Sequence, residues 1–280
     1  MTLMFSVWVG RARFATRLAL ALSAGLAVGS TTGCSRPDGA SSSAAAQAPN
    51  VVTVPFVGCP QDGSYGASPA PTGAVKVVQL DAITASKLAF YSDISHGILA
   101  PRGWSCFGFA GPGATTLYVA PPPVGQSDVI DGNWRGPVVE LFETGNDSQG
   151  RFDVARFITR LFPAHQAYAQ SVINEGVEPA SDFPTGVPAT DKVNRLSDEL
   201  VEYETPPNTD GLGVAMRLQP GEDPLDGFVL LRGQTPAVVF AAVRLGPEMR
   251  DLAPTLVGQV ERDSGMDRRS PGNVPVALSH

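Results

Sequence analysis

Apolar residues recur with the 3.6-residue period of an α-helix in three parts of the chain. The first part is 81–92, which opens on an aspartate, a favoured N-cap residue. The second begins at Phe152 and should end or kink at Pro163, because proline disrupts a helix interior. The third opens at Pro247, and proline is favoured in the first turn of a helix. Because Pro254 falls inside the third part, we expect either a kink there or a later start.

Short apolar runs between Gly-, Pro- and Asp-rich segments predict β-strands in other parts of the chain. The predicted strands are 116–120, 138–142, 200–205, 214–218, 228–231 and 237–243. The last four follow one another through short turns, which favours antiparallel pairing. Together with the helices they predict an α+β fold, in which a mostly antiparallel sheet is flanked by helices in a single domain.

The N-terminal 33 residues differ from the rest of the chain. They contain three arginines and no acidic residue, and 18–28 is a mostly apolar run of 11 residues. This run is too short to span a hydrocarbon core of about 30 Å as a helix, which takes roughly 20 residues. A basic start, a short apolar run and small residues after it are typical of a secretory signal peptide. We therefore expect residues 1–33 to be removed on export.

The end of this segment, Gly33-Cys34, resembles the lipobox of bacterial lipoproteins, in which the cysteine is lipidated and becomes the first mature residue. Thr31 departs from the family pattern, which usually has Leu, Val or Ile at that place. The resemblance implies lipid attachment at Cys34 and a membrane partner. Because Ser35 rather than Asp follows, it further implies the outer membrane, facing the periplasm, in a Gram-negative host. The alternative is an ordinary signal peptide cleaved nearby, with Cys34 an incidental thiol.

Composition divides the remainder into three parts. Residues 34–50 are small and polar, as in a flexible tether that holds a domain away from a membrane. Residues 51–262 have the length and patterning of one globular α+β domain. Residues 263–280 are polar with Ser, Gly and Pro, and we expect a disordered tail.

Charge limits the range of partners. Without the three arginines of the signal, 17 basic residues face 27 acidic ones, a net charge of −10. Nucleic-acid binding depends on basic patches, and the chain carries no cluster of Lys and Arg. We therefore expect no nucleic-acid partner.

The chain has three cysteines. If Cys34 carries lipid, Cys59 and Cys106 remain, and in an exported protein they are expected to form a disulfide. The alternative is a pair of buried free thiols. Two cysteines without neighbouring histidines do not complete a zinc site, and the C-x-x-C spacing of redox catalysts is absent.

The segment Leu99-Ala-Pro-Arg-Gly-Trp-Ser-Cys-Phe-Gly108 stands apart from its surroundings. With Phe56-Val-Gly-Cys59 it resembles a group of uncharacterised bacterial exported proteins, a resemblance that implies no activity. Its Pro-x-Gly-Trp before a strand is similar to the PsbP-like α/β sandwich, which concerns the fold alone. Arg102 and Trp104 are candidate binding residues, because a guanidinium beside an aromatic face can recognise a carboxylate or phosphate. Alternatively, Trp104 packs on the disulfide and Arg102 bonds turn carbonyls.

The sequence contains no motif that indicates a catalytic site, a metal site or a cofactor. The three histidines, His96, His165 and His280, lack metal-type spacing, and we expect solvent-facing or helix-end roles for them. No G-x-S-x-G nucleophile elbow is present. Glu202 and Glu204 share one face of a predicted strand, and paired carboxylates can hydrolyse glycosides when burial raises the pKa of one. The alternative is an ordinary solvated face, and the acidic 222–227 turn lacks the spacing of a calcium loop.

These observations favour a lipid-anchored envelope protein whose domain binds an envelope protein or glycan without catalysis. A carboxylate-dependent hydrolase acting on envelope material is the alternative, and it requires a pocket with at least two acidic side chains. A third hypothesis, a small-molecule carrier, requires an apolar cavity.

Overall fold

The computed structural model describes residues 50–122, 127, 131–145 and 149–265. The predicted signal peptide, lipidation at Cys34, the tether before Asn50 and the tail beyond Gly265 lie outside these residues. No helix in the described ranges is long and apolar enough to cross a membrane.

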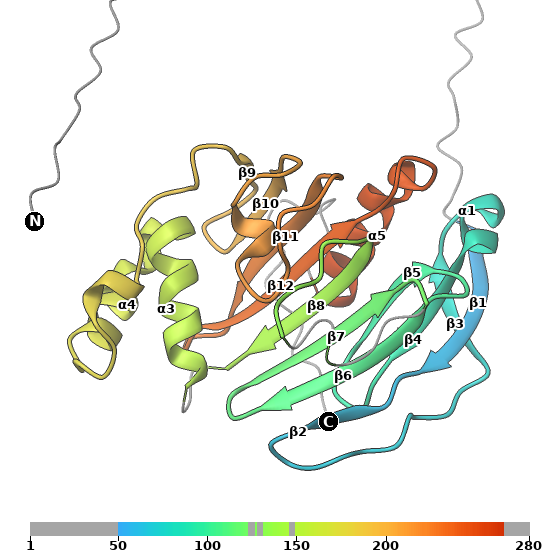
Figure 1. Ribbon diagram of the computed structural model, residues 1–280, viewed down its shortest axis with the longest axis horizontal. Helices are drawn as coiled ribbons and strands as arrows, with labels where there is room; N and C mark the ends of the chain where they lie inside the picture. The colour runs from blue at the N-terminus through green and yellow to red at the C-terminus, as the bar shows by residue number, and fades with distance from the viewer. Residues whose placement is uncertain (1–49, 123–126, 128–130, 146–148, 266–280) are drawn as a thin grey trace, which may run out of the picture. The chain divides into compact units, whose positions relative to one another are not determined.

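The larger of two β-sheets has eight strands in the order β2-β6-β7-β8-β12-β11-β10-β9 (Figure 1). Neighbours run antiparallel except for β2 and β6, which run parallel. The strands are β2 Gln61–Gly63, β6 Ser105–Gly111, β7 Ala114–Ala120, β8 Val138–Thr144, β9 Lys192–Arg195, β10 Leu200–Thr205, β11 Leu225–Arg232 and β12 Ala237–Arg244.

The smaller sheet has four strands in the order β3-β1-β4-β5. The central pair, β1 and β4, runs parallel, and the two outer pairs run antiparallel. Its strands are β1 Val51–Gly58, β3 Val75–Gln79, β4 Leu88–Ser92 and β5 Gly97–Pro101, with the short helix α1 Ala82–Lys87 before β4.

The helices cover both faces of the large sheet. Strand β12 shows the division: Val239 and Ala241 belong to a core with the small sheet and α5, whereas Val238 and Phe240 belong to a second core with α3 and α4. This alternation is what a strand buried on both faces requires. The α-helices that cover these faces are α3 Gly150–Leu161, α4 Gln166–Ile173 and α5 Ala253–Asp263, and the 3₁₀ turns are η1 Pro163–His165, η2 Ala180–Asp182, η3 Leu212–Val214 and η4 Arg250–Leu252.

The predicted α+β class with mostly antiparallel pairing is confirmed, although the strands form two sheets rather than one. The helix predicted from Phe152 is confirmed as α3, and a 3₁₀ turn begins at Pro163. The last helix starts late, at Ala253, with Pro254 in its first turn, where the missing N–H costs no hydrogen bond.

Two predicted elements are wrong. The helix expected over 81–92 begins as predicted, since the Asp81 side chain accepts a hydrogen bond from the Thr84 N–H (2.9 Å), but it ends at Lys87. The following run becomes β4, because it is paired on both sides and buried. The strand expected over 214–218 is instead the end of η3 and a bent, irregular stretch, with an isolated bridge at Leu218.

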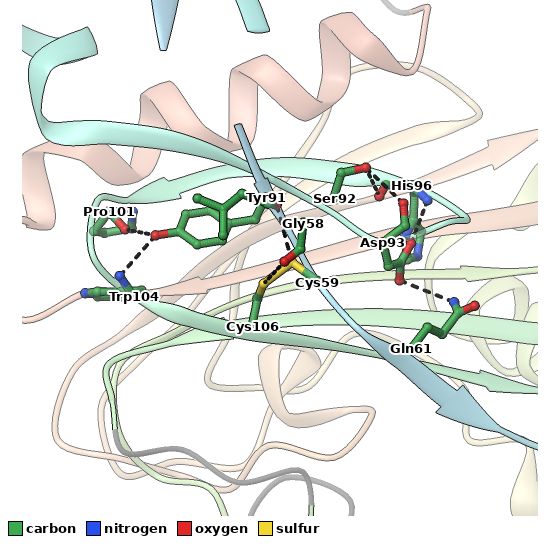
Figure 2. The surroundings of a disulfide bond; sticks show 11 residues. Gly58, Cys59, Gln61, Tyr91, Ser92, Asp93, His96, Pro101, Trp104 and Cys106 are labelled. Atoms are coloured by element: carbon green, nitrogen blue, oxygen red, sulfur yellow. Dashed lines mark hydrogen bonds and ion pairs between the residues drawn. A yellow bond between two sulfur atoms is a disulfide. The ribbon is translucent and has the colours of Figure 1, made fainter. Parts of the chain in front are cut away.

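A disulfide joins the two sheets (Figure 2). Cys59 directly follows β1 of the small sheet, and Cys106 lies in β6 of the large sheet. The bond confirms the predicted pairing, with a sequence separation of 47 residues. On the chain-entropy model, closing a loop of this length stabilises the fold by about 4 kcal/mol.

Candidate functional site

A cleft of about 560 Å³ lies between α3 and two segments that follow it in the chain. We call it the α3 cleft. Its volume falls within the range of about 300–1,000 Å³ that is typical of small-molecule sites. Four lining residues come from one face of α3, at spacings of three and four residues. They are Asp153, Arg156, Phe157 and Arg160, and they face residues 182, 184–188, 210–212 and 214–216.

Hydrogen bonds hold the 182–188 segment against the helix. The Thr159 hydroxyl donates to the Pro184 carbonyl (2.9 Å), and the Arg156 Nε donates to the Asp182 carbonyl (3.2 Å). Gly186 has a φ of +79°, a conformation that glycine adopts without strain. This wall of the cleft is therefore fixed by α3 itself.

The opposite wall, around η3, is fixed by hydrogen bonds to two side chains. The Asp191 carboxylate accepts a hydrogen bond from the Leu212 N–H (2.6 Å), and the Thr205 hydroxyl oxygen accepts one from the Gly213 N–H (3.0 Å). A Cβ at Gly211 would lie 2.1 Å from Asp191 Oδ1. Glycine is therefore required here, because any side chain would push the wall away from its anchor.

Two arginines on α3 face the cleft in different electrostatic states. Arg156 is neutralised, because it forms ion pairs with Asp153 (2.7 Å) and with Glu178. Arg160 makes no hydrogen bond or ion pair with any described residue, although it is half-buried. Burial lowers its pKa, while the charge of nearby Asp191 acts in the opposite direction. The cleft therefore contains one guanidinium group that is partly withdrawn from water and is not paired with a described carboxylate.

The base of the cleft is apolar. Phe157 and Leu212 line it and are buried, and Val214 and Met216 pack against the same core. The Phe157 ring lies 5.6 Å from the ring of Phe240 on β12, measured between centroids. The cleft thus combines a rigid apolar base with polar groups above it, which suits an amphipathic small molecule.

A second, smaller cavity of about 320 Å³ gathers the carboxylates that the sequence singled out. Glu202 and Glu204 on β10 line it together with Asp226 on β11, which is directly opposite Glu204 in the register. Lys192 donates to Glu204 (2.7 Å), and Asn194 donates to Glu202 (3.1 Å). Burial, followed by the charge of Glu204, raises the pKa of Asp226. We call this cavity the acidic groove.

Arg102 and Trp104 line neither cavity. The Trp104 N–H donates to the Tyr91 hydroxyl (3.0 Å), and that hydroxyl donates to the Pro101 carbonyl (2.8 Å; Figure 2). The Trp104 ring is partly buried against the core that contains Cys59. The exposed Arg102 side chain donates to the Leu88 carbonyl (3.4 Å). Both residues therefore make local contacts at the β5–β6 corner, and their role in binding stays a prediction.

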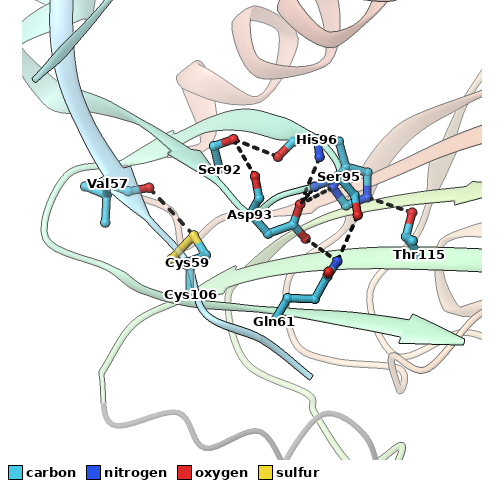
Figure 3. Close-up of polar contacts among 9 residues, drawn as sticks. All are labelled: Val57, Cys59, Gln61, Ser92, Asp93, Ser95, His96, Cys106 and Thr115. Atoms are coloured by element: carbon cyan, nitrogen blue, oxygen red, sulfur yellow. Dashed lines mark hydrogen bonds and ion pairs between the residues drawn. A yellow bond between two sulfur atoms is a disulfide. The ribbon is translucent and has the colours of Figure 1, made fainter. Parts of the chain in front are cut away.

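His96 is not in the solvent-facing or helix-end position that we expected. Its ring lies 3.0 Å from the Asp93 carboxylate and 3.4 Å from the Thr115 hydroxyl, with little exposure (Figure 3). Burial raises the pKa of Asp93, but hydrogen bonds and charge from His96, with the Ser95 N–H, bring it below the usual value. The pair closes the β4–β5 turn and lines neither cavity. His165, by contrast, precedes α4 as its N-cap residue.

Sequence reasoning missed a buried carboxyl group. Glu140 on β8 is fully buried, and neither oxygen makes a hydrogen bond to a described residue. Across the register it lies beside Tyr118 on β7. Burial raises its pKa to about 8, against the opposing influence of the Tyr118 hydroxyl and of Arg217. A lone polar residue in an apolar strand was the available signal, because Glu interrupts the run Val138-Val-Glu-Leu-Phe142.

The described residues contain no group of three or more His, Cys, Asp or Glu side chains placed to hold a metal ion. Comparison with protein families, with curated proteins and with solved structures finds no match to this chain. The candidate sites are therefore judged on their geometry.

Proposed function

We propose that this chain is an exported, lipid-anchored binding protein of the bacterial cell envelope, and that its domain takes up a small molecule in the α3 cleft. The signal sequence, the lipobox-like Gly33-Cys34 and the tether support the location. The cleft supports the activity, because its walls are fixed and its base is apolar. The observation that carries the proposal is Arg160, a half-buried cation that has no described partner and lines this cleft.

Among the hypotheses drawn from the sequence, the structure favours the carrier. Recognition of an envelope protein or glycan through Arg102 and Trp104 stays a prediction. It has less support than the cleft, because Arg102 and Trp104 are engaged in local backbone contacts. The cleft residues, in contrast, surround a volume that a ligand can fill.

The test is an NMR screen of the full-length ¹⁵N-labelled chain against a library of small organic acids, amides and alcohols. We expect ligands to shift the amide resonances of the cleft walls, with Gly186 and Gly211 as reporters. The variant Ala215→Trp, which places a large ring among the lining residues, should abolish these shifts. Ala82→Trp on exposed α1 is the control and should not. Shifts scattered over the surface, or unaffected by Ala215→Trp, would contradict the proposal.

The acidic groove carries a second candidate function, a carboxylate-dependent hydrolase. The specific observation is that burial and the charge of Glu204 raise the pKa of Asp226, which lies directly opposite Glu204, while Glu204 accepts a hydrogen bond from Lys192. In glycoside hydrolysis, an acid of raised pKa protonates the leaving oxygen while an ionised carboxylate acts on the other side of the bond.

This candidate is tested by release of p-nitrophenol from p-nitrophenyl N-acetyl-β-glucosaminide. Activity that is lost in both Asp226→Asn and Glu204→Gln, and retained in Glu248→Gln, would support a hydrolase. Undetectable turnover by the intact chain on this substrate and on peptidoglycan would remove the candidate and leave the binding proposal unaffected.

A further inference from the structure

The charges around the α3 cleft narrow the class of ligand. The lining includes two cations, Arg156 and Arg160, and three carboxylates, Asp153, Asp182 and Asp210. Arg156 is already paired with Asp153, and it also donates to the Asp182 carbonyl, so it has little capacity left for a ligand. Arg160 is therefore the lining cation that can bind a charged group of the ligand.

The surroundings of Arg160 do not supply its missing partner. Asp191 influences it through charge, but no hydrogen bond joins the two side chains in the described structure. Asp191 Oδ2 accepts the Leu212 N–H, and Asp191 Oδ1 makes no hydrogen bond to a described residue, Arg160 included. Burial also raises the pKa of this carboxyl group, which disfavours its charged form. A planar guanidinium in this position is suited to two parallel hydrogen bonds with a ligand carboxylate.

The acidic side chains at the same cleft argue for a single negative charge on the ligand. Asp182 and Asp210 are exposed, and each would repel a dianion such as a phosphate monoester more strongly than a monoanion. The rest of the ligand meets Phe157, Leu212 and Met216, so an apolar body gains from burial there.

We infer that the α3 cleft binds monocarboxylates with an apolar body, and that Arg160 receives the carboxylate. The inference rests on the proposed function, because it names the ligand class of the same site. The carboxylate lies against the guanidinium, and the apolar body lies on the base between α3 and η3.

The experiment compares 4-phenylbutyrate with its neutral amide, 4-phenylbutyramide, by NMR titration of the full-length chain. The two probes have the same shape and differ in charge. We expect the carboxylate to bind at least tenfold more tightly than the amide, with shifts at the reporters Gly186 and Gly211.

Variants of Arg160 separate charge from shape. Arg160→Gln should weaken 4-phenylbutyrate at least tenfold and leave the amide unchanged, whereas Arg160→Lys should give an intermediate loss. Arg262→Gln, the same substitution on α5 at the other face of the large sheet, is the matched control and should change neither affinity. Thermal unfolding of each variant verifies that it is folded.

Three results would overturn the inference. Equal affinity of the two probes, or full retention of 4-phenylbutyrate by a folded Arg160→Gln, would show that the cleft does not select a carboxylate. In both cases the proposed function would stand, because binding in the cleft would still be observed. If neither probe binds at millimolar concentration while other library members do, the ligand class is wrong. If nothing in the library binds, the proposed function fails as well.

Discussion

Raising the pH through the neutral range should weaken the fold, because the unfolded chain ionises Glu140 freely while the native protein holds this side chain protonated. The side chain is fully buried on β8, and its oxygens have no hydrogen-bond partner among the described residues. Burial raises its pKa from 4.5 to about 8, although the Tyr118 hydroxyl and the charges of Arg217 and Arg244 favour the ionised form. The uncharged carboxyl is therefore the form that suits the native state.

The magnitude follows from the proton balance. In the unfolded chain Glu140 ionises near pH 4.5, whereas in the native state it keeps its proton up to a pH of about 8. Between these values the native state binds more protons, so the free energy of unfolding falls by about 1.4 kcal/mol per pH unit. The contribution is fully present below the lower value and is lost as the pH rises through the higher one. The total loss is about 5 kcal/mol, of which about 3 kcal/mol is already lost at neutral pH.

The assay is urea unfolding of the wild-type chain and of Glu140→Gln at a series of pH values. Glutamine keeps the shape and does not ionise, so the difference in unfolding free energy isolates this one group. We expect the variant to gain on the wild type by about 1.4 kcal/mol per pH unit across the window. Glu143→Gln on the same strand is the control, since its side chain is half-exposed. Equal pH slopes for the two differences would refute the reasoning.

Three further predictions concern stability. Replacing Cys59 and Cys106 by alanine should lower the free energy of unfolding by up to about 4 kcal/mol, measured in urea against the oxidised parent; an unchanged midpoint would contradict the role assigned to the disulfide. Asp93→Asn should flatten the loss of stability in acid, because the pKa of Asp93 is lowered in the native state and its contribution disappears as the pH falls through that lowered value. Gly211→Ala should cost on the order of 1–3 kcal/mol, since its Cβ meets Asp191; thermal unfolding at the parent's midpoint would show the clash is relieved.

The local sequence pattern was sufficient to predict those helices and strands whose hydrophobic period is unambiguous. Helix α3 and strand β10 were predictable because each has a clear boundary, at Pro163 and at Thr205-Pro206. The 81–92 stretch misled because four consecutive buried residues of β4 follow a genuine N-cap at Asp81. A strand covered on both faces has no alternation, so it resembles the continuation of a helix.

The disulfide was predictable by counting cysteines, but the α3 cleft was not predictable from any local signal. Its lining residues are spread over 153–216, and the importance of Arg160 depends on its having no hydrogen-bond or ion-pair partner among the described residues. The acidic groove was predictable in part. The two-residue period of a strand placed Glu202 and Glu204 on one face, whereas the sequence indicated Asp226 as a turn residue and not as their neighbour. Pairing between strands supplied the missing contact.

The position of the Cys59–Cys106 bond determines how the domain responds to mechanical tension from its N-terminal side. Force applied at Asn50 loads β1 and can strip it from β3 and β4. Extension must stop at Cys59, because the covalent bond then transmits the load directly into β6 of the large sheet. The segment between the two cysteines is thereby shielded from stretching as long as the bond stays oxidised. If the chain is anchored at its N-terminus as we propose, tension on the anchor detaches β1 before the large sheet carries the force.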